Sequence, residues 1–143
     1  MAYLLDSNIL RHYSAQHPTL SENLKRVASH TILIPVIVYA EQLRGRIEGL
    51  LNAEPQRLLL AQQHLKATQE LLSDFEILDL DEATTSVVER LKRQIKTRKR
   101  YADIVMAAQA IAGNHVIVTR NIADFQDILP SAQLQNLVDN RTG

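Results

Sequence analysis

The segment "VIVTRNIADF", residues 116–125, begins as an apolar strand and then places a hydroxyl, a carboxamide and a carboxylate within six residues. Thr119, Asn121 and Asp124 supply these three groups. All three residue types are common in turns and helix caps, so local turn chemistry is one explanation. A polar site at the carboxyl end of a buried strand is the other explanation, and the rest of the chain must decide between them.

The rest of the chain alternates short apolar runs with helical patterns. The apolar runs predict strands at residues 2–5, 31–35, 75–80, 115–119 and 134–138. Apolar residues at spacings of three and four predict helices at residues 7–14, 20–29, 36–51, 55–73, 81–98 and 103–112. This alternation is typical of an α/β fold in which a mostly parallel central sheet is covered by helices on both faces.

Three of the predicted helices differ in how they are expected to pack. Residues 103–112 are apolar nearly all round, so this helix should be buried. The leucine-rich helix 55–73 could pack in the core, join a dimer interface or hold a protein partner, and core packing is the favoured interpretation. In helix 36–51, the expected buried face is the stripe Val36, Ala40, Leu43, Ile47 and Leu50.

Composition restricts the class of protein. Apolar residues make up 45% of the 143-residue chain, which is enough for one folded domain with its own core. The 16 basic and 16 acidic residues cancel, which excludes a globally basic nucleic-acid coat but permits a local basic patch. The absence of cysteine excludes disulfides and thiol chemistry. The sequence contains no secretory signal and no apolar run of roughly 18 residues, so we expect a soluble, cytoplasmic protein without a membrane span.

Four carboxylates fall where an open α/β sheet places its ligands, beyond the carboxyl ends of the strands. Asp6 directly follows the first predicted strand, and Asp124 closely follows the fourth. Glu41 lies in the second turn of the helix after the second strand. Asp103 starts the buried helix that leads into the fourth strand. These four residues are far apart in sequence, yet the predicted topology could gather them at one edge of the sheet.

Gathered carboxylates repel one another unless a cation neutralises them. Mg²⁺ and Mn²⁺ prefer oxygen ligands, usually one or two carboxylates together with water molecules. Such an ion can activate a water molecule and stabilise charge on a phosphodiester. The neutral side chains of Ser7, Asn8, Thr119 and Asn121 would then provide hydrogen bonds that orient the ligands.

Each acid also has a purely structural explanation. Asp6 and Asp103 could be helix caps, and Asp124 could be a turn residue. Glu41 could form an ordinary helix-surface ion pair with Arg44. These explanations are strong for single residues and weak together, because all four acids would have to fall by chance at positions that the sheet favours.

A basic segment leads towards Asp103. Residues 90–100 contain seven Lys or Arg residues and no acid, and Arg98, Lys99 and Arg100 could neutralise phosphates of a nucleic acid. A solvated helix face is the alternative explanation. Aromatic residues make up only 4% of the chain, so extensive base stacking is not expected. Four further arginines near the predicted site could contact phosphate or an acidic partner: Arg11, Arg44, Arg46 and Arg120.

The same residues carry a resemblance to the PIN-domain nucleases, and within them to the VapC-like toxins of bacterial toxin–antitoxin pairs. "YLLDSNIL" resembles the family's opening strand and Asp-Thr-Asn motif, with Ser7 in the Thr position. "IPVIVYAEQLRG" is similar to the second strand and the helix with the family's Glu, which falls on Glu41. "YADIVMAAQAIAGNHVIVTRNIADF" resembles the block that contains the third and fourth acids, which fall on Asp103 and Asp124.

The resemblance implies a fold, a reaction and partners. It implies one PIN-like nuclease domain over residues 1–143, folded as a three-layer α/β/α sandwich. The implied reaction is metal-dependent endonucleolytic hydrolysis of RNA, with Mg²⁺ or Mn²⁺ held by Asp6, Glu41, Asp103 and Asp124. The implied partners are a second copy of the chain, in a homodimer, and a cognate antitoxin whose C-terminal segment fills the active groove.

Two other functions stay open at this point. A phosphatase or phosphotransferase could use Asp6 as a nucleophile after the first strand, although Asn8 stands where a second acid would be common in such a scheme. A noncatalytic PIN-like module that binds nucleic acid or protein could use the four acids only as caps and turn residues.

Overall fold

A five-stranded parallel sheet forms the centre of the molecule, with the strand order β3-β2-β1-β4-β5. The computed structural model describes residues 1–27, 31–96 and 98–139. All five predicted strands are present, each slightly shorter than expected. Their bounds are β1 Tyr3–Leu5, β2 Ile32–Pro35, β3 Glu76–Leu78, β4 Val116–Val118 and β5 Leu134–Gln135.

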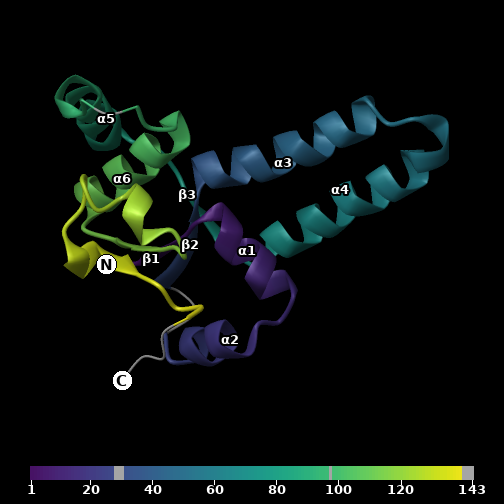
Figure 1. The fold of residues 1–143 in the computed structure, drawn as a ribbon, viewed down its shortest axis with the longest axis horizontal. Coiled ribbons are helices and arrows are strands. Elements are labelled where there is room, and N and C mark those ends of the chain that lie inside the picture. Colours follow the sequence, from purple (N-terminus) through teal and green to yellow (C-terminus); the bar gives the residue numbers. More distant parts are fainter. Residues whose placement is uncertain (28–30, 97, 140–143) are drawn as a thin grey trace.

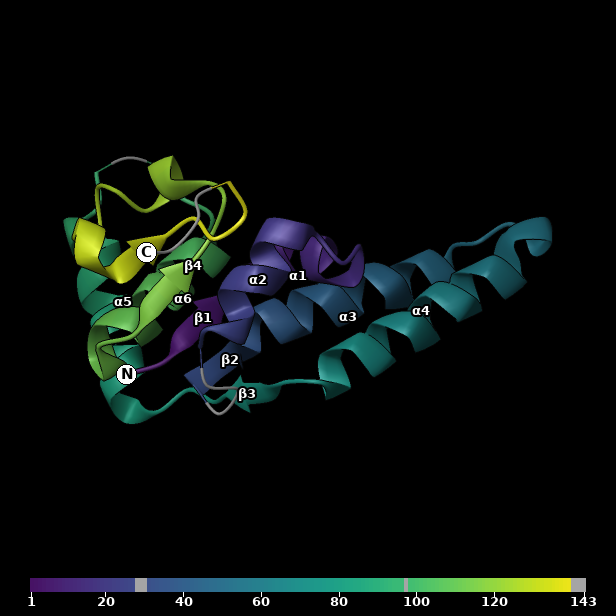
Figure 2. The ribbon, with the colours of Figure 1, turned by 90° about the horizontal axis from the view of Figure 1, so that it is seen from below.

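Helices cover both faces of this sheet, as the sequence predicts for a three-layer α/β/α sandwich. Their bounds are α1 Ser7–Ser14, α2 Pro18–Lys25, α3 Val36–Leu51, α4 Leu58–Ser73, α5 Glu82–Gln94 and α6 Tyr101–Gly113. Short 3₁₀ turns are η2 Pro55–Arg57, η3 Ile122–Asp124 and η4 Ser131–Gln133. Figure 2 shows α5 and α6 on one side of the sheet and α1 to α4 on the other. The predicted ends of two helices, at residues 28–29 and 97, lie outside the described residues.

The connections explain the position of the site. From β1 the chain moves through β2 to the edge strand β3, and it then crosses back to β4 on the other side of β1. Right-handed crossovers in these opposite directions place the connecting helices on opposite faces of the sheet. The order in which the chain adds strands to the sheet therefore reverses between β1 and β4. Sheets of this kind bind ligands in the crevice at the carboxyl ends of the two strands where the order reverses.

The core is built around the two central strands and α6. Leu4, Leu5 and Ile117 are completely buried in the sheet. Every residue of α6 from 102 to 110 is buried, which confirms the prediction for this helix. Four of these nine residues are alanines, and their small side chains let the helix approach the strands closely. The close packing of α6 on the sheet therefore fixes the position of Asp103 relative to the strands.

Helices α3 and α4 form a hairpin that projects away from the sheet (Figure 1). The stripe predicted to form the buried face of α3 is wrong, since Val38 is the only buried residue of this helix. Ala40 is exposed, and residues 44–49 are all exposed because α3 leaves the body of the protein after its second turn. In α4, burial is confined to Thr68 and Leu72 near the sheet, so core packing is wrong for most of this helix.

No helix in the described ranges is both long enough and apolar enough to cross a lipid bilayer.

The end of α6 contains a glycine, Gly113, that is more closely packed than the other glycines in the described part of the chain. Asn114 follows the helix in the left-handed conformation, with φ of 52°. The imidazole of His115 then turns back, and its Nδ1 accepts a hydrogen bond of 3.0 Å from the backbone N–H of Ala2. A Cβ atom on Gly113 would collide with this imidazole ring. Gly113 therefore leaves room for a side chain that ties the N-terminal strand to α6.

We expect Gly113→Ala to lower the free energy of unfolding by about 1–3 kcal/mol, the usual cost of overpacking. Gly45→Ala is the matched control, because Gly45 lies inside α3 and an added Cβ would meet no atom within 4 Å beyond its chain neighbours and the backbone of its own helix. That change should stabilise the protein by about 0.5–1 kcal/mol, since alanine favours a helix over glycine. Urea unfolding measures both changes, and equal effects of the two substitutions would contradict the close packing at His115.

Candidate active site

Asp6 lies at the crevice between β1 and β4 and is held through both carboxylate oxygens. Its Oδ1 accepts a hydrogen bond of 2.6 Å from the backbone N–H of Ser7. Its Oδ2 accepts a hydrogen bond of 2.8 Å from the hydroxyl of Thr119. Asp6 is also the N-cap of α1, so the cap and the site explanations apply to the same residue. The carboxylate is buried and fixed in one orientation.

The neutral residues predicted around the site contribute in different ways. The Thr119 hydroxyl both donates to Asp6 and accepts the backbone N–H of Asn121 at 3.0 Å. Ser7 and Asn121 therefore contribute through their backbones, whereas the sequence suggested side-chain hydrogen bonds. The Oδ1 atom of Asn8 is buried without a hydrogen-bond partner.

The charges of the other three acids all act on the carboxyl of Asp103. Burial raises the pKa of the Asp103 carboxyl, and Arg100 opposes this effect. The charges of Asp6, Asp124 and Glu41 each raise the same pKa further. Asp103 lies in the first turn of α6 and is not its cap, because the N-cap position belongs to Arg100. The structure thus brings together four acids that are widely separated in sequence.

Arg100 provides positive charge between two of these acids. Its Nη2 lies 3.5 Å from Oδ1 of Asp103 and 3.7 Å from Oε1 of Glu41. Its side chain is 63% exposed, so the guanidinium can move away from the acids at little cost. The alternative pairing of Glu41 with Arg44 is wrong, because Arg44 instead lies 4.0 Å from Glu48.

Lys99 is directed towards the segment that carries Asp124. Its Nζ donates to the backbone carbonyl of Asp124 at 2.9 Å and lies 2.8 Å from Oδ1 of Asp127. The side chain is only 15% exposed, whereas Arg98 is exposed to solvent. Sequence reasoning assigned no role to Asp127, and an acid one turn after Asp124 was the signal that could have found it. The predicted basic triplet therefore divides into three different environments.

The residues present suit a hard divalent cation. The Oε1 atom of Glu41 is buried without a hydrogen-bond donor, and Asn8 offers a second unbonded oxygen. Within the described residues, no three acidic or histidine side chains stand close enough to enclose a metal ion together. Mg²⁺ needs only one or two carboxylates and completes its shell with water. The oxygen-only donor set and the unbonded oxygens fit such an ion.

The raised pKa of Asp103 predicts the pH dependence of the metal-free protein. A raised folded-state pKa contributes stability that is complete below the ordinary Asp pKa and is lost as pH rises through the raised value. We therefore expect Asp103→Asn to melt at a higher temperature than the parent at neutral pH in chelator, and the difference should shrink as the solution is acidified.

Asp81 is the control of opposite sign, because hydrogen bonds from Thr84 lower the pKa of its carboxyl. Its contribution to stability is present above the ordinary Asp pKa and is lost on acidification, so Asp81→Asn should melt at a lower temperature at neutral pH. Thermal melts across a pH series measure both effects. An Asp103→Asn variant that melts below the parent at every pH would contradict the expectation that ionised Asp103 destabilises the metal-free protein.

Comparison with known proteins identifies the family. A model of the PIN domain matches residues 3–128. Ribonuclease VapC2 of Rickettsia felis is 30% identical over 141 residues, which cover 95% of this chain and 98% of that protein. The structure of VapBC2 from Rickettsia felis, bound to a DNA fragment from its promoter, gives a TM-score of 0.72 at 30% identity, covering 95% of this chain and 98% of that chain.

A second solved structure agrees in fold. VapBC-1 from nontypeable Haemophilus influenzae gives a TM-score of 0.75 at 21% identity and covers 97% of this chain and 100% of that chain. The predicted resemblance is therefore confirmed by a match that spans most of the sequence. The alternation of strands and helices, the acid-bearing crevice and these matches together establish that the chain belongs to the PIN-domain family.

Proposed function

We propose that this chain is a metal-dependent endoribonuclease that hydrolyses RNA phosphodiester bonds and serves as the toxin of a toxin–antitoxin pair. The observation that carries the proposal is the convergence of four acids at the crevice between β1 and β4, where Asp103 is influenced by the other three. The relative named a ribonuclease supports the reaction. We further propose that residues 1–143 act as one nuclease domain in the cytoplasm, where its RNA substrate would be found.

Asp6, Glu41, Asp103 and Asp124 would hold Mg²⁺ or Mn²⁺. When bound, this ion would supply an activated water molecule and stabilise negative charge on the phosphate. Thr119 and the Ser7 backbone fix the orientation of the Asp6 carboxylate through their hydrogen bonds. The buried oxygen of Glu41, which has no hydrogen-bond donor, supports its place among the ligands.

Arg100 and the ion would compete for the same carboxylates. The guanidinium lies within 3.7 Å of both Glu41 and Asp103, and its exposed side chain is free to turn outward. Once released, it could pair with a phosphate of the RNA, since guanidinium groups bind phosphate in a forked geometry. Arg98, two residues earlier in the chain, is also exposed and could contribute in the same way, while Lys99 would act mainly by holding the segment of Asp124.

Two protein partners are part of the proposal. The VapBC complexes among the similar structures support a cognate antitoxin. Leucines exposed at the end of the hairpin support a homodimer or another protein contact, with Leu51 78% and Leu59 74% exposed. The molar mass of the purified chain, alone and co-expressed with a candidate antitoxin, measures both associations.

The two rival functions make different chemical predictions. An Asp6 nucleophile would form a covalent aspartyl-phosphate, which a metal-activated water does not. A noncatalytic module would show neither cleavage nor stabilisation by metal. The hydrogen bonds to both oxygens of Asp6 favour a positioned ligand over an attacking group.

The first test of the proposed function is cleavage of RNA by highly purified protein in Mg²⁺ or Mn²⁺. We expect Thr119→Val to lower the cleavage rate roughly 10–100-fold, the usual cost of removing the hydrogen-bond partner of a metal ligand. Asp6→Asn removes the ligand itself, so its cleavage rate should fall further. Chelator should abolish cleavage by the parent. Equal cleavage by the parent and Asp6→Asn, prepared identically, would assign the activity to a contaminant or to another site.

A second test separates the roles within the basic triplet. Lys99→Met should weaken metal binding, measured by calorimetry, because the segment of Asp124 loses the ammonium that ties its carbonyl to Asp127. Arg98→Ala is the matched control, since its exposed side chain should affect RNA binding and leave metal binding unchanged. Unchanged metal affinity in Lys99→Met would limit Lys99 to the nucleic-acid role expected from the sequence.

A further inference from the structure

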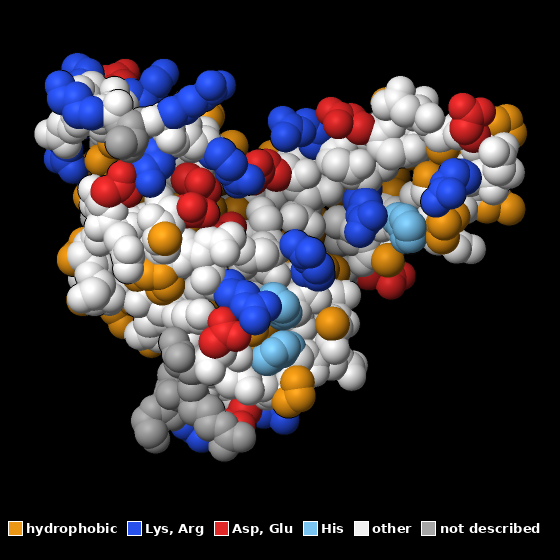
Figure 3. Space-filling view, viewed as in Figure 1, with side chains coloured by type: hydrophobic (Ala, Val, Ile, Leu, Met, Phe, Trp, Pro, Cys, Tyr) orange, Lys and Arg blue, Asp and Glu red, His pale blue; other side chains and the backbone are white. Residues whose placement is uncertain are grey.

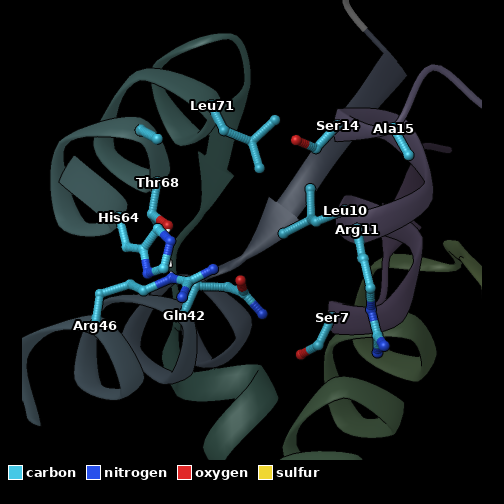
Figure 4. Close-up of a pocket in the computed structure, with 11 residues that line it drawn as sticks. Ser7, Leu10, Arg11, Ser14, Ala15, Gln42, Arg46, His64, Thr68 and Leu71 are labelled. Atoms are coloured by element: carbon cyan, nitrogen blue, oxygen red, sulfur yellow. Dashed lines mark hydrogen bonds between the residues drawn. The ribbon is translucent and has the colours of Figure 1, made fainter. Parts of the chain in front are cut away.

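A cavity of about 470 Å³ opens between α1 and the base of the α3–α4 hairpin (Figure 4). Its volume lies within the range of about 300–1,000 Å³ that is usual for ligand sites. Figure 4 shows Arg46 and His64 together on the hairpin side and Arg11 on the side of α1. None of the described residues that line the cavity is acidic. Its charge is therefore opposite to that of the four-acid crevice.

The two arginines of this cavity differ from Arg44 and Arg120, which are both paired with acids. Arg44 pairs with Glu48, and the guanidinium of Arg120 lies 3.0 Å from Asp139 through each of two nitrogens. By contrast, neither Arg11 nor Arg46 forms a salt bridge to any carboxylate in the described ranges. Their charge therefore remains available to a bound anion.

Arg46 is held in position without being neutralised. Its Nε donates a hydrogen bond of 3.1 Å to the hydroxyl of Thr68, one of the few buried residues of α4. This bond uses one N–H group and leaves the two terminal nitrogens of the guanidinium for a ligand. Ser7 and Gln42 add neutral polar groups to the lining. The cavity thus offers a fixed cation and hydrogen-bonding side chains to one ligand.

The cavity and the acidic crevice are continuous along two segments of the chain. Ser7 lines the cavity and directly follows Asp6, while Gln42 lines it and directly follows Glu41. Figure 3 shows acidic side chains gathered where the hairpin meets the rest of the molecule, with Lys and Arg side chains on both sides. An RNA backbone that runs from the acids towards α1 would pass over this boundary, and the acids alone would repel it.

We infer that this cavity binds a backbone phosphate of the RNA next to the phosphate that is cleaved, with Arg11 and Arg46 as its cationic contacts. The inference rests on the proposed function, since it assigns the second site to the same substrate. Guanidinium groups bind phosphate in a forked geometry, so two of them with no carboxylate among the described lining residues suit a backbone phosphate. Binding of the backbone positions RNA in register and leaves sequence selection to other contacts.

The test measures binding of a short, labelled single-stranded RNA of mixed sequence across a range of salt concentrations. All proteins carry Asp6→Asn, so that the RNA stays intact, and cleavage by the parent is measured separately. Each phosphate contact to a single strand contributes about 0.7 to the slope of log K against log salt. Arg11→Ala with Arg46→Ala should therefore lower the slope by about 1.4, and Arg44→Ala should leave it unchanged.

The single variants and Arg46→Lys protect the test against a failure of the double variant to fold. Each single alanine variant should lower the slope by about 0.7. Arg46→Lys retains the charge and should restore the slope, although it loses the forked geometry and binds RNA more weakly. If Arg46 has only a structural role, Arg46→Lys and Arg46→Ala should show the same salt dependence of RNA binding.

The outcomes separate this inference from the proposed function. Cleavage by the parent with an unchanged salt slope in the alanine variants would overturn the phosphate site and leave the nuclease intact. A lowered slope without cleavage by the parent would support a phosphate contact at the cavity, but it would overturn the nuclease and with it the place of this contact next to a cleaved phosphate. If the alanine variants bind RNA normally but lose affinity for the co-expressed antitoxin, the cavity is a protein-binding site and the inference is wrong.

Discussion

The hydrogen bond from Thr119 to Asp6 depends on the pairing of β1 with β4, and the rest of the site is arranged around it. The two residues are 113 positions apart, yet they meet because Leu5 pairs with Val118 in parallel register. A slip of one residue would turn every side chain of one strand to the opposite face of the sheet. The apolar side chains of β1 and β4 therefore secure the polar site as well as the core.

Balance of charge is the second constraint on this molecule. The four acids would repel one another in a folded chain, and Arg100 offsets part of that repulsion from the exposed side. Lys99 supports the same region by a different route, through the backbone of Asp124. Arg100 and Lys99 therefore already place positive charge near the acids. A divalent ion would bind where these side chains partly balance the negative charge.

The sequence predicted best those features that depend on pattern within one segment. Helix α6 is buried because almost all of its residues are apolar, and the carboxyl-end rule placed Asp6 and Asp124 correctly relative to the strands. Prediction from sequence failed for features that depend on how one segment is placed relative to another. The stripe of α3 was wrong because nothing in its pattern shows that the helix leaves the sheet, and the direction of Lys99 depends on Asp127 across a turn.

The projecting hairpin of α3 and α4 connects the edge strand β3 to β2 and takes little part in the core. Its outer turns can therefore be lengthened, shortened or changed in sequence without disturbing the central strands. Its base, in contrast, carries both Glu41 and Arg46 and cannot vary so freely. One element thus carries side chains of the acidic crevice and the cavity at one end and is free to vary at the other, so a change in its outer turns could alter protein contacts without altering the crevice.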